Sequence, residues 1–406
     1  MTIEKENLKV NFAGIEFKNP FVLASGPPTK DAERIIRAAK MGWGGAVTKT
    51  IAKEPTVDAR TRLGYLRRGR TLYGMNNIEL ITREPLKRWT EDWIPKIKED
   101  APKDFVLIGS IMAPSVDEEW AALATAIQDA GADMIELNIS CPHGTPEKRM
   151  GAFIGQNPDL TKHATEAVKS AAKIPVIVKI TPNVTDIIPI AKAAVEGGAD
   201  AISGINTIES LIGIDIGTAT PLPKVYGPKP SIWQSTYGGY CGPAIRPVGL
   251  RIVAQVAKAI PQIPISGIGG VETWENAVEY MMVGAKTVQI CSVVMWRGYG
   301  VISKLTRGLA DFLQRKGYSS IDEVVGEALP KITSWGALPK LPPIVAEVDP
   351  VRCTGCARCV VACRDGGYEA IKMDEALAVI APDMCDGCGL CEVVCEDDAI
   401  RFKHKV

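Results

Sequence analysis

The sequence predicts an α/β fold, a barrel of eight parallel strands that alternate with helices, known as the (β/α)8 or TIM barrel. Short apolar, β-branched runs recur along the first 300 residues, and segments with helical periodicity separate them. Continuous apolar runs are typical of parallel strands buried on both faces. Eight strand–helix units match the number that closes a barrel, and a doubly wound open sheet is the alternative.

The eight predicted strands are short and rich in Val, Ile, Leu and Ala. They are "FVLASG" (21–26), "AVTKT" (46–50), "VLIGSIM" (106–112), "MIELNIS" (134–140), "VIVKITP" (176–182), "AISGINT" (201–207), "PISGIGG" (264–270) and "TVQICSV" (287–293). Between them, "VDEEWAALATAIQDAGA" (116–132) and "IIPIAKAAVEGGA" (187–199) have helical periodicity and end near a glycine, a common helix stop. Before the first strand, "LKVNFAGIEFKNP" (8–20) predicts a hairpin with a glycine turn that covers the base of the barrel.

Composition excludes several classes of protein. The 406 residues are 46% hydrophobic, enough for a large core, and Lys+Arg equals Asp+Glu at 47 each, so no charge surplus indicates a nucleic-acid partner. The start, "MTIEKENLKV" (1–10), lacks an apolar signal region, and no apolar run reaches about 18 residues. We therefore expect a soluble cytoplasmic protein without membrane contact, whose 11 cysteines serve metal binding or catalysis.

Composition changes near residue 335. The stretch "GALPKLPPIVAEVDP" (336–350) is rich in proline and lacks helical periodicity, so we interpret it as a linker. The predicted domains are a barrel at 1–335, then a linker and a small domain at 336–406. A long insertion, "TATPLPKVYGPKPSIWQSTYGGY" (218–240), precedes the seventh strand, and its sequence suggests no role.

The small domain carries two cysteine runs, "CTGCARCVVAC" (353–363) and "CDGCGLCEVVC" (385–395), both with the spacing Cys-x2-Cys-x2-Cys-x3-Cys. In bacterial two-cluster ferredoxins this spacing binds one [4Fe-4S] cluster with three cysteines and sends the fourth to the other cluster. The predicted ligand sets are Cys353, Cys356, Cys359 and Cys395 for one cluster, and Cys385, Cys388, Cys391 and Cys363 for the other. We therefore predict a small α+β ferredoxin-like domain. Structural zinc is the alternative, although zinc sites more often use separated Cys-x2-Cys pairs.

One-electron clusters require a redox partner in the barrel, and a flavin exchanges both one and two electrons. Glycine pairs at Gly238-Gly239 and Gly269-Gly270, followed by Cys291-Ser292, flank the last two predicted strands. Loops at this part of a barrel commonly bind phosphate through backbone N–H groups, which favours FMN. No G-x-G-x-x-G motif follows a strand and opens a helix, so we expect no NAD site in this chain.

Polar residues follow six of the predicted strands at their carboxyl ends, the face that carries the active site of a barrel. They are Ser25, Lys49, Ser110, Asn138, Lys179, Asn206 and Thr207. One such residue is usually a helix cap, but seven indicate a ligand site. Two lysines at one mouth are expected to require an anionic ligand.

The stretch "ELNISCPHGTPEKRMG" (136–151) places Cys141 beside His143 in a polar loop. The residues that follow Cys141 argue against its burial, so we favour a role in acid–base chemistry, which a thiol next to an imidazole supports. The alternatives are a buried core cysteine and a zinc site shared with His143. Cys241 and Cys291 have no histidine beside them, and we expect them to serve packing.

Taken together, these motifs make the chain resemble the dihydropyrimidine dehydrogenases, relatives of the dihydroorotate dehydrogenases. The resemblance covers nearly the whole chain and is greatest to the flavin and iron–sulfur subunit of the two-subunit bacterial type. The matching stretches are "NPFVLAS", "GWGGAVTKT", "NNIELI", "ADMIELNISCPHG", "VKITPNVTD", "INTIESL", "GGYCGPAIRP", "SGIGGVETW" and "CRDGGYEAI".

The resemblance implies a role for each candidate residue. FMN would lie near Ala24, Ser25, Lys49, Asn138 and Lys179, and its phosphate near Gly238, Gly239, Gly269, Gly270, Cys291 and Ser292. The pyrimidine would be held by Asn77, Asn138, Asn206 and Thr207. Cys141 would be the general acid, His143 would tune it or relay protons, and "TPEKRMGAFIGQ" (145–156) would form a lid hinged at Gly144 and Gly151.

The implied reaction is reduction of the C5=C6 bond of uracil or thymine, with hydride from N5 of FMN and a proton from Cys141. Electrons would arrive through both clusters from a partner subunit that binds FAD and NAD(P), so a hetero-oligomer is expected. One alternative is a dihydroorotate dehydrogenase-like enzyme acting on another cyclic amide or enone; a carboxylate-bearing substrate would need an extra cation. The other is an electron-transfer subunit in which the flavin is only a relay.

Overall fold

The computed structural model describes residues 8–55, 62–142, 149–226 and 233–405. The chain divides into two compact units, Met1–Pro330 and Lys331–Val406. The predicted boundary, between residues 335 and 336, lies five residues after this division.

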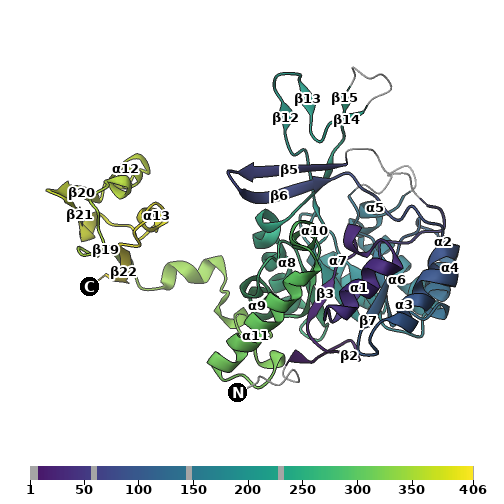
Figure 1. Ribbon diagram of the computed structural model, residues 1–406. Helices are drawn as coiled ribbons and strands as arrows, with labels where there is room; N and C mark the ends of the chain where they lie inside the picture. The colour runs from purple at the N-terminus through teal and green to yellow at the C-terminus, as the bar shows by residue number, and fades with distance from the viewer. Residues whose placement is uncertain (1–7, 56–61, 143–148, 227–232, 406) are drawn as a thin grey trace. The chain divides into compact units, whose positions relative to one another are not determined.

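The first unit contains a closed barrel of eight parallel strands, which confirms the predicted fold (Figure 1). All eight predicted runs form its strands. Around the barrel the order is β10-β17-β18-β3-β4-β7-β8-β9. The bounds are β3 (Phe21–Leu23), β4 (Gly45–Val47), β7 (Val106–Ile111), β8 (Met134–Asn138), β9 (Val176–Lys179), β10 (Ala201–Gly204), β17 (Ile265–Ile268) and β18 (Ala285–Ile290).

The strand register brings the polar strand ends together. Every residue of β7 and β8 is buried, as expected for strands covered on both faces. Asn138, the last residue of β8, pairs with Lys179, the last residue of β9, and Lys179 pairs with Ser203 of β10. Parallel pairing without an offset therefore places the predicted polar residues at one end of the barrel.

Helices surround the strands, and none in the described part of the chain is long and apolar enough to cross a membrane. The predicted helix at 116–132 is α4 (Asp117–Asp129), and that at 187–199 is α7 (Ile188–Glu196). The remaining helices of the first unit are α1 (Ala32–Lys40), α2 (Leu86–Arg88), α3 (Ile94–Asp100), α5 (Ala152–Gly155), α6 (Pro158–Ala171), α8 (Arg246–Ala259), α9 (Trp274–Met282), α10 (Ser292–Arg297) and α11 (Ile302–Lys316).

The predicted N-terminal hairpin is present as β1 (Val10–Phe12) and β2 (Ile15–Phe17). Its turn residues Ala13 and Gly14 have φ angles of 50° and 85°, as a tight type I′ turn requires. Phe12 and Phe17 are buried and pack edge to face in the barrel core, with ring centroids 6.2 Å apart. The hairpin is therefore part of the barrel's hydrophobic core.

A separate four-stranded antiparallel sheet, in the order β11-β16-β6-β5, adds to the carboxyl end of the barrel (Figure 1). Its strands are β5 (Leu63–Arg68), β6 (Thr71–Asn77), β11 (Ile208–Ser210) and β16 (Gly238–Cys241). The described parts of the 218–240 insertion form pieces of two hairpins and then enter this sheet through β16. The hairpin strands are β12 (Ile214–Asp215), β13 (Thr220–Pro221), β14 (Val225–Tyr226) and β15 (Trp233–Gln234). The insertion thus supplies strand β16, which lies between β11 and β6 in this sheet.

The second unit is a small α+β domain with two antiparallel strand pairs. They are β19 (Ile344–Val348) with β22 (Ile400–His404), and β20 (Ile371–Asp374) with β21 (Leu377–Ile380). Helices α12 (Arg358–Asp365) and α13 (Leu390–Val393) begin within the two cysteine runs. The predicted linker at 336–350 is only partly irregular, because the β-branched stretch at 344–348 pairs along its whole length with β22.

Candidate active site

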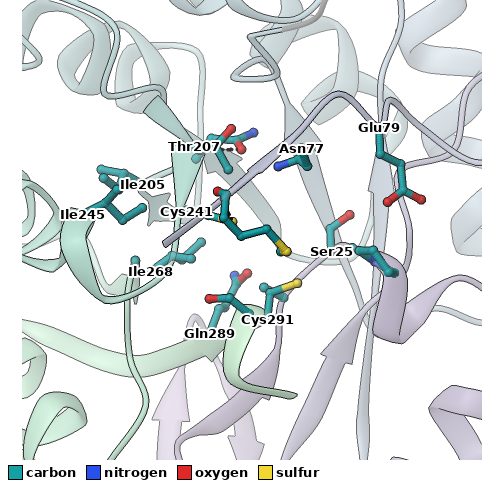
Figure 2. A pocket seen from close by; sticks show the side chains of 18 of the residues that line it. Ser25, Asn77, Glu79, Ile205, Thr207, Cys241, Ile245, Ile268, Gln289 and Cys291 are labelled. Carbon is teal, nitrogen blue, oxygen red and sulfur yellow. Dashed lines mark hydrogen bonds between the residues drawn. The ribbon is translucent and has the colours of Figure 1, made fainter. Parts of the chain in front are cut away.

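One pocket of about 1000 Å³, including its open mouth, lies at the carboxyl ends of the barrel strands. Its wall combines barrel strand ends with residues of β5, β6 and β16, and Figure 2 shows Asn77 and Thr207 on the side opposite Gln289 and Cys291. Thirteen predicted site residues line it: Ala24, Ser25, Lys49, Asn77, Asn138, Cys141, Lys179, Asn206, Thr207, Gly269, Gly270, Cys291 and Ser292. His143 lies outside the described residues.

Lys179 reaches the pocket from the end of β9, where it meets a buried carboxylate. Its Nζ lies 3.4 Å from Oε1 of Glu136, a fully buried residue of β8. Ser203 and Gln289 each donate a hydrogen bond of 2.8 Å to the other oxygen of Glu136. This network fixes the Lys179 ammonium in the pocket wall and balances its charge.

Lys49 is also paired, with a residue that sequence reasoning missed. Its Nζ lies 3.0 Å from Oε1 of Glu79, and both side chains are less than a tenth exposed. Arg62 approaches the same oxygen at 3.7 Å but does not line the pocket. Each pocket lysine therefore has a carboxylate partner within the protein, which balances its charge before any ligand binds. In the sequence, Glu79 is distinguished only by its position two residues after Asn77, the last residue of β6.

Thr50 links the polar groups around Asn138. Its hydroxyl lies 3.2 Å from the Ser25 hydroxyl and 2.9 Å from the Ser110 hydroxyl, and it accepts a 2.9 Å hydrogen bond from Asn138 Nδ2. The Asn138 side-chain oxygen, Oδ1, in turn accepts from the Ser140 hydroxyl at 3.0 Å. The Asn138 amide is therefore held in one orientation at the pocket wall.

Asn206 and Thr207 follow β10 and join the same network. Asn206 Nδ2 donates to Ser140 Oγ at 2.9 Å and to Asn138 Oδ1 at 3.4 Å. The backbone N–H of Thr207 donates to Asn206 Oδ1 at 2.7 Å. On the facing sheet, Asn77 Nδ2 donates to the carbonyl oxygen of Gly239 at 3.0 Å. The structure thus brings together the four residues predicted to bind substrate.

Gly238 and Gly239 do not fit the predicted phosphate site. They lie inside strand β16, which pairs with β11 on one side and β6 on the other, and they do not line the pocket. Glycine is required at position 239 for a different reason, because a Cβ there would lie 2.1 Å from Thr207 Oγ1. Paired strand backbone has no N–H groups to spare for a phosphate, so this part of the prediction was wrong.

Gly242, and not Gly238 or Gly239, lines the pocket together with Gly269 and Gly270. All three line the pocket, with φ angles of 98°, 130° and 69° that favour glycine. A Cβ on Gly270 would lie 2.7 Å from the carbonyl oxygen of Gly242, so the two backbones are adjacent. Together with Cys291 and Ser292 they form a backbone-rich wall of the kind that binds phosphate in barrels.

Three cysteines line the pocket. Cys141 is only 8% exposed and packs with Ala52, Ile81 and Met112, so the sequence argument against its burial was wrong. Burial raises the pKa of the Cys241 thiol to about 12 and that of Cys291 to about 11. These two thiols therefore remain protonated at neutral pH. Cys241 also contacts the backbone of β6, where its sulfur lies 3.2 Å from the carbonyl oxygen of Met75.

Further groups of the pocket also fit FMN. Gln289 Oε1 is buried and accepts no hydrogen bond from the described residues, so a polar ligand at the pocket floor would satisfy it. Lys179 and the Gly242–Gly270 wall lie in the same pocket. These groups suit the polar ring edge and the phosphate of a flavin mononucleotide.

In the second unit the eight cysteines gather in the predicted sets. One cavity of about 350 Å³ is lined by Cys353, Cys356, Cys359 and Cys395, and one of about 340 Å³ by Cys363, Cys385, Cys388 and Cys391. Backbone N–H groups already point at three of the sulfurs: Ala370 donates to Cys363 at 3.2 Å, Ala399 to Cys395 at 3.2 Å and Ala346 to Cys385 at 3.5 Å. Such contacts stabilise thiolates and tune cluster potentials.

Each cysteine set has the number of thiolates that one cubane needs. A cubane binds each of four thiolates to a different iron, and four cysteines line each cavity.

A parallel barrel with a flavin pocket and a domain with two four-cysteine sites define a flavin and iron–sulfur oxidoreductase. The family Dihydroorotate dehydrogenase matches residues 7–313, and 4Fe-4S dicluster domain matches residues 346–402. The chain belongs to the dihydroorotate dehydrogenase family, with FMN and two [4Fe-4S] clusters as its cofactors.

Three relatives illustrate the activities found among proteins similar to this chain. It is 37% identical to NAD-dependent dihydropyrimidine dehydrogenase subunit PreA of Escherichia coli K12 over 374 residues, 91% of this chain and 88% of the relative. It is 37% identical to the chloroplastic dihydropyrimidine dehydrogenase (NADP(+)) of Arabidopsis thaliana, over 82% and 80% of the two chains. It is 40% identical to the catalytic subunit of dihydroorotate dehydrogenase B (NAD(+)) of Thermococcus kodakarensis, over 81% and 100%. The chain is thus a dehydrogenase of the dihydropyrimidine and dihydroorotate type.

Proposed function

We propose that this chain reduces the C5=C6 bond of an uncharged pyrimidine, uracil or thymine. The chain is 37% identical to a dihydropyrimidine dehydrogenase subunit and 40% identical to a dihydroorotate dehydrogenase subunit, so sequence identity does not distinguish their two substrates. The charges and polar groups of the pocket supply the distinction. The observation that carries the proposal is the ion pair between Lys49 and Glu79 in the pocket wall.

The charge balance of the pocket favours a neutral substrate. Lys49 and Lys179 are the cationic side chains among the described lining residues, and each lies within 3.4 Å of a carboxylate oxygen. A substrate carboxylate, as in dihydroorotate, would lie near the buried Glu79 carboxylate and be repelled by it. Because charges in a poorly solvated site interact strongly, this repulsion disfavours dihydroorotate.

The amide groups match a pyrimidine ring. Asn77, Asn138 and Asn206 line one pocket, and each amide offers one carbonyl oxygen and two N–H donors. The edge of uracil alternates carbonyl acceptors with N–H donors, so these amides and the Thr207 hydroxyl complement it. The hydrogen bonds to Thr50 and Ser140 hold two of the amides in place and limit the entropy lost on binding.

The chain's residues then complete the reaction. FMN, when bound, supplies the hydride for C6 of the ring, and the clusters supply its electrons one at a time. The Cys141 thiol donates its proton to C5, and its sulfur becomes a thiolate that is reprotonated before the next turnover. The 8% exposure of Cys141 keeps bulk water from this position. We assign His143 to reprotonation of that thiolate.

The source of electrons is proposed to be a partner subunit that binds FAD and NAD(P). This chain has no dinucleotide-binding fingerprint, yet two clusters provide a path for electrons from outside the barrel. The Escherichia coli relative is itself named as a subunit of an NAD-dependent enzyme, which supports a hetero-oligomer. Eight cysteines that must remain reduced for cluster binding favour the cytoplasm.

An anaerobic titration tests the substrate. The protein, loaded with FMN and clusters, would be mixed separately with dihydrouracil, dihydrothymine and dihydroorotate, and flavin absorbance would be followed. We expect bleaching with the first two compounds. Bleaching by dihydroorotate alone would instead support the dihydroorotate dehydrogenase alternative, and no bleaching by any of the three would support an electron-transfer subunit.

A further inference from the structure

Asn183 lies in the segment after β9, outside the lining of the pocket, and its amide bridges two backbone groups of another segment. Its Nδ2 donates to the carbonyl oxygen of Thr207 at 3.1 Å, and its Oδ1 accepts from the backbone N–H of Glu209 at 2.9 Å. Thr181, fully buried, accepts from both nitrogens of Asn183 at 3.2 and 3.1 Å. The Asn183 amide is therefore fixed in orientation and in turn fixes residues 207–209.

The backbone of Asn183 contacts the segment that follows Cys141. The carbonyl oxygen of Asn183 accepts a 2.9 Å hydrogen bond from Gln156 Nε2. Gln156 is the C-terminal cap of α5, and the first residue of α5, Ala152, donates its backbone N–H to the carbonyl oxygen of Cys141 at 3.0 Å. A continuous series of hydrogen bonds thus connects Thr207 to Cys141 through Asn183.

We propose that Asn183 is a positioning residue that sets the distance between the acid Cys141 and the substrate-binding Thr207. This inference rests on the proposed function, in which both residues touch the pyrimidine. Asn183 does not line the pocket, so it acts only through these two residues. A proton donor and a bound ring must align closely, and misplacement by about 1 Å can cost about 100-fold in rate.

The expected effects follow from the hydrogen bonds that a variant loses. Asn183→Ala frees both the Thr207 carbonyl and the Glu209 N–H, and we expect KM for uracil to rise about tenfold, as loss of two net hydrogen bonds implies. The Asn183 backbone carbonyl that accepts from Gln156 remains in this variant, so we expect kcat to fall because residues 207–209 are no longer fixed relative to residue 183. Asn183→Asp keeps the acceptor for Glu209 but faces the Thr207 carbonyl with an oxygen, so we expect KM to remain raised.

Amide hydrogen exchange distinguishes positioning from local stability. In FMN-loaded protein without substrate, Asn183→Ala should raise exchange in 207–210 and also in 152–156 by about fivefold or more. With uracil, wild-type protein should gain protection in both segments, and the variant in 207–210 only. The control is Asn19→Ala, which also removes one donated and one accepted backbone hydrogen bond, but at the amino end of the barrel.

The outcomes separate this inference from the proposed function. Exchange in 152–156 that stays within about twofold of wild type, outside the expected coupling range, would overturn the inference. So would an Asn183→Asp variant with wild-type KM, or an Asn19→Ala control that loosens both segments equally. Failure of wild-type protein to bind uracil would contradict the proposed function alone. The exchange measurement without substrate would still test whether Asn183 connects residues 207–210 with residues 152–156.

Discussion

The ammonium group of Lys49 lies 3.0 Å from the carboxylate of Glu79, and both side chains are buried in the wall of the pocket. Lys49 follows barrel strand β4, whereas Glu79 follows β6 of the added sheet, so the pair joins two parts of the first unit. Removing one partner of a buried pair leaves an uncompensated charge, which is costly. Under the proposed function, this pair disfavours a substrate that carries a carboxylate.

Replacing Glu79 should change substrate preference. In Glu79→Gln the repulsion of a substrate carboxylate is removed and Lys49 lacks its partner, so the affinity for orotate relative to uracil should rise about tenfold or more, equivalent to about 1.4 kcal/mol. Competition binding to FMN-loaded protein measures this ratio. Glu209→Gln, which neutralises an exposed carboxylate on β11, is the matched control and should leave the ratio unchanged. An unchanged ratio in Glu79→Gln would show that the ion pair does not select the substrate.

Replacing Cys141 should remove turnover while leaving binding intact. General acid catalysis typically contributes about 10²–10⁴-fold, so Cys141→Ala should lose about that factor in kcat. Cys141→Ser is a much weaker acid and should retain a small fraction of the rate, and His143→Gln should have a smaller effect. Rates are measured with reduced viologen as donor, and uracil binding is measured separately. A Cys141→Ala rate within about threefold of wild type, below that catalytic range, would reduce the thiol to a packing role.

Each four-cysteine set should lose its own cluster independently of the barrel. Cys388→Ala removes one of the four cysteines around one cavity, and Cys356→Ala removes one from the other cavity. Both variants should retain about four of the eight irons that two cubanes contain. Bound FMN should be unchanged, because both cysteines lie in the second compact unit. Iron and sulfide analysis, together with flavin content, checks this; zinc without sulfide in wild-type protein would reject the clusters.

The two other pocket thiols should resist alkylation and make stability depend on pH. Burial raises the pKa of Cys291 to about 11 and that of Cys241 to about 12, from an ordinary 9.0, so both stay protonated and unreactive towards iodoacetamide at pH 8. The folded state holds these protons more tightly than the unfolded state. Their contribution to stability is therefore complete below pH 9 and is lost as pH rises to about 11 and 12.

Peptide mapping after labelling and urea unfolding from pH 8 to 11 test this prediction. A Cys241→Ala, Cys291→Ala double variant should lose stability less steeply over that range. Rapid labelling of either cysteine in folded protein at pH 8 would contradict the assignment.

The isolated chain should not oxidise NADH or NADPH at a useful rate, because it lacks a dinucleotide fingerprint. It should nevertheless reduce pyrimidine when reduced viologen supplies electrons. Stopped-flow absorbance at the nicotinamide band gives the first rate and product analysis the second. Fast NADH oxidation by the chain alone would remove the need for a partner subunit.

Local patterns predicted the barrel and the cluster sites well. Strands such as β7 and β8 are continuous apolar runs, and α4 ends near a glycine, so neighbouring residues alone were sufficient. The cysteine spacing predicted which cysteines line each cavity, because this spacing places three cysteines of one run and the last cysteine of the other run around one site.

Pairing between distant segments explains what sequence reasoning missed. Gly238 and Gly239 are strand residues because β16 inserts between β11 and β6, which no local pattern indicates. Cys141 is buried by residues from separate loops, Ala52, Ile81 and Met112. Glu79 could not be recognised as the partner of Lys49, because 30 residues of chain separate them and only the fold brings them together.

The most direct test of the account is a competition in one vessel. Equal concentrations of uracil and orotate would be added anaerobically to the fully loaded chain with excess reduced viologen, and the products would be quantified by mass spectrometry. We expect dihydrouracil to form while orotate remains, since the proposed role of the Lys49–Glu79 pair is to exclude a substrate carboxylate. Dihydroorotate as the main product would contradict it.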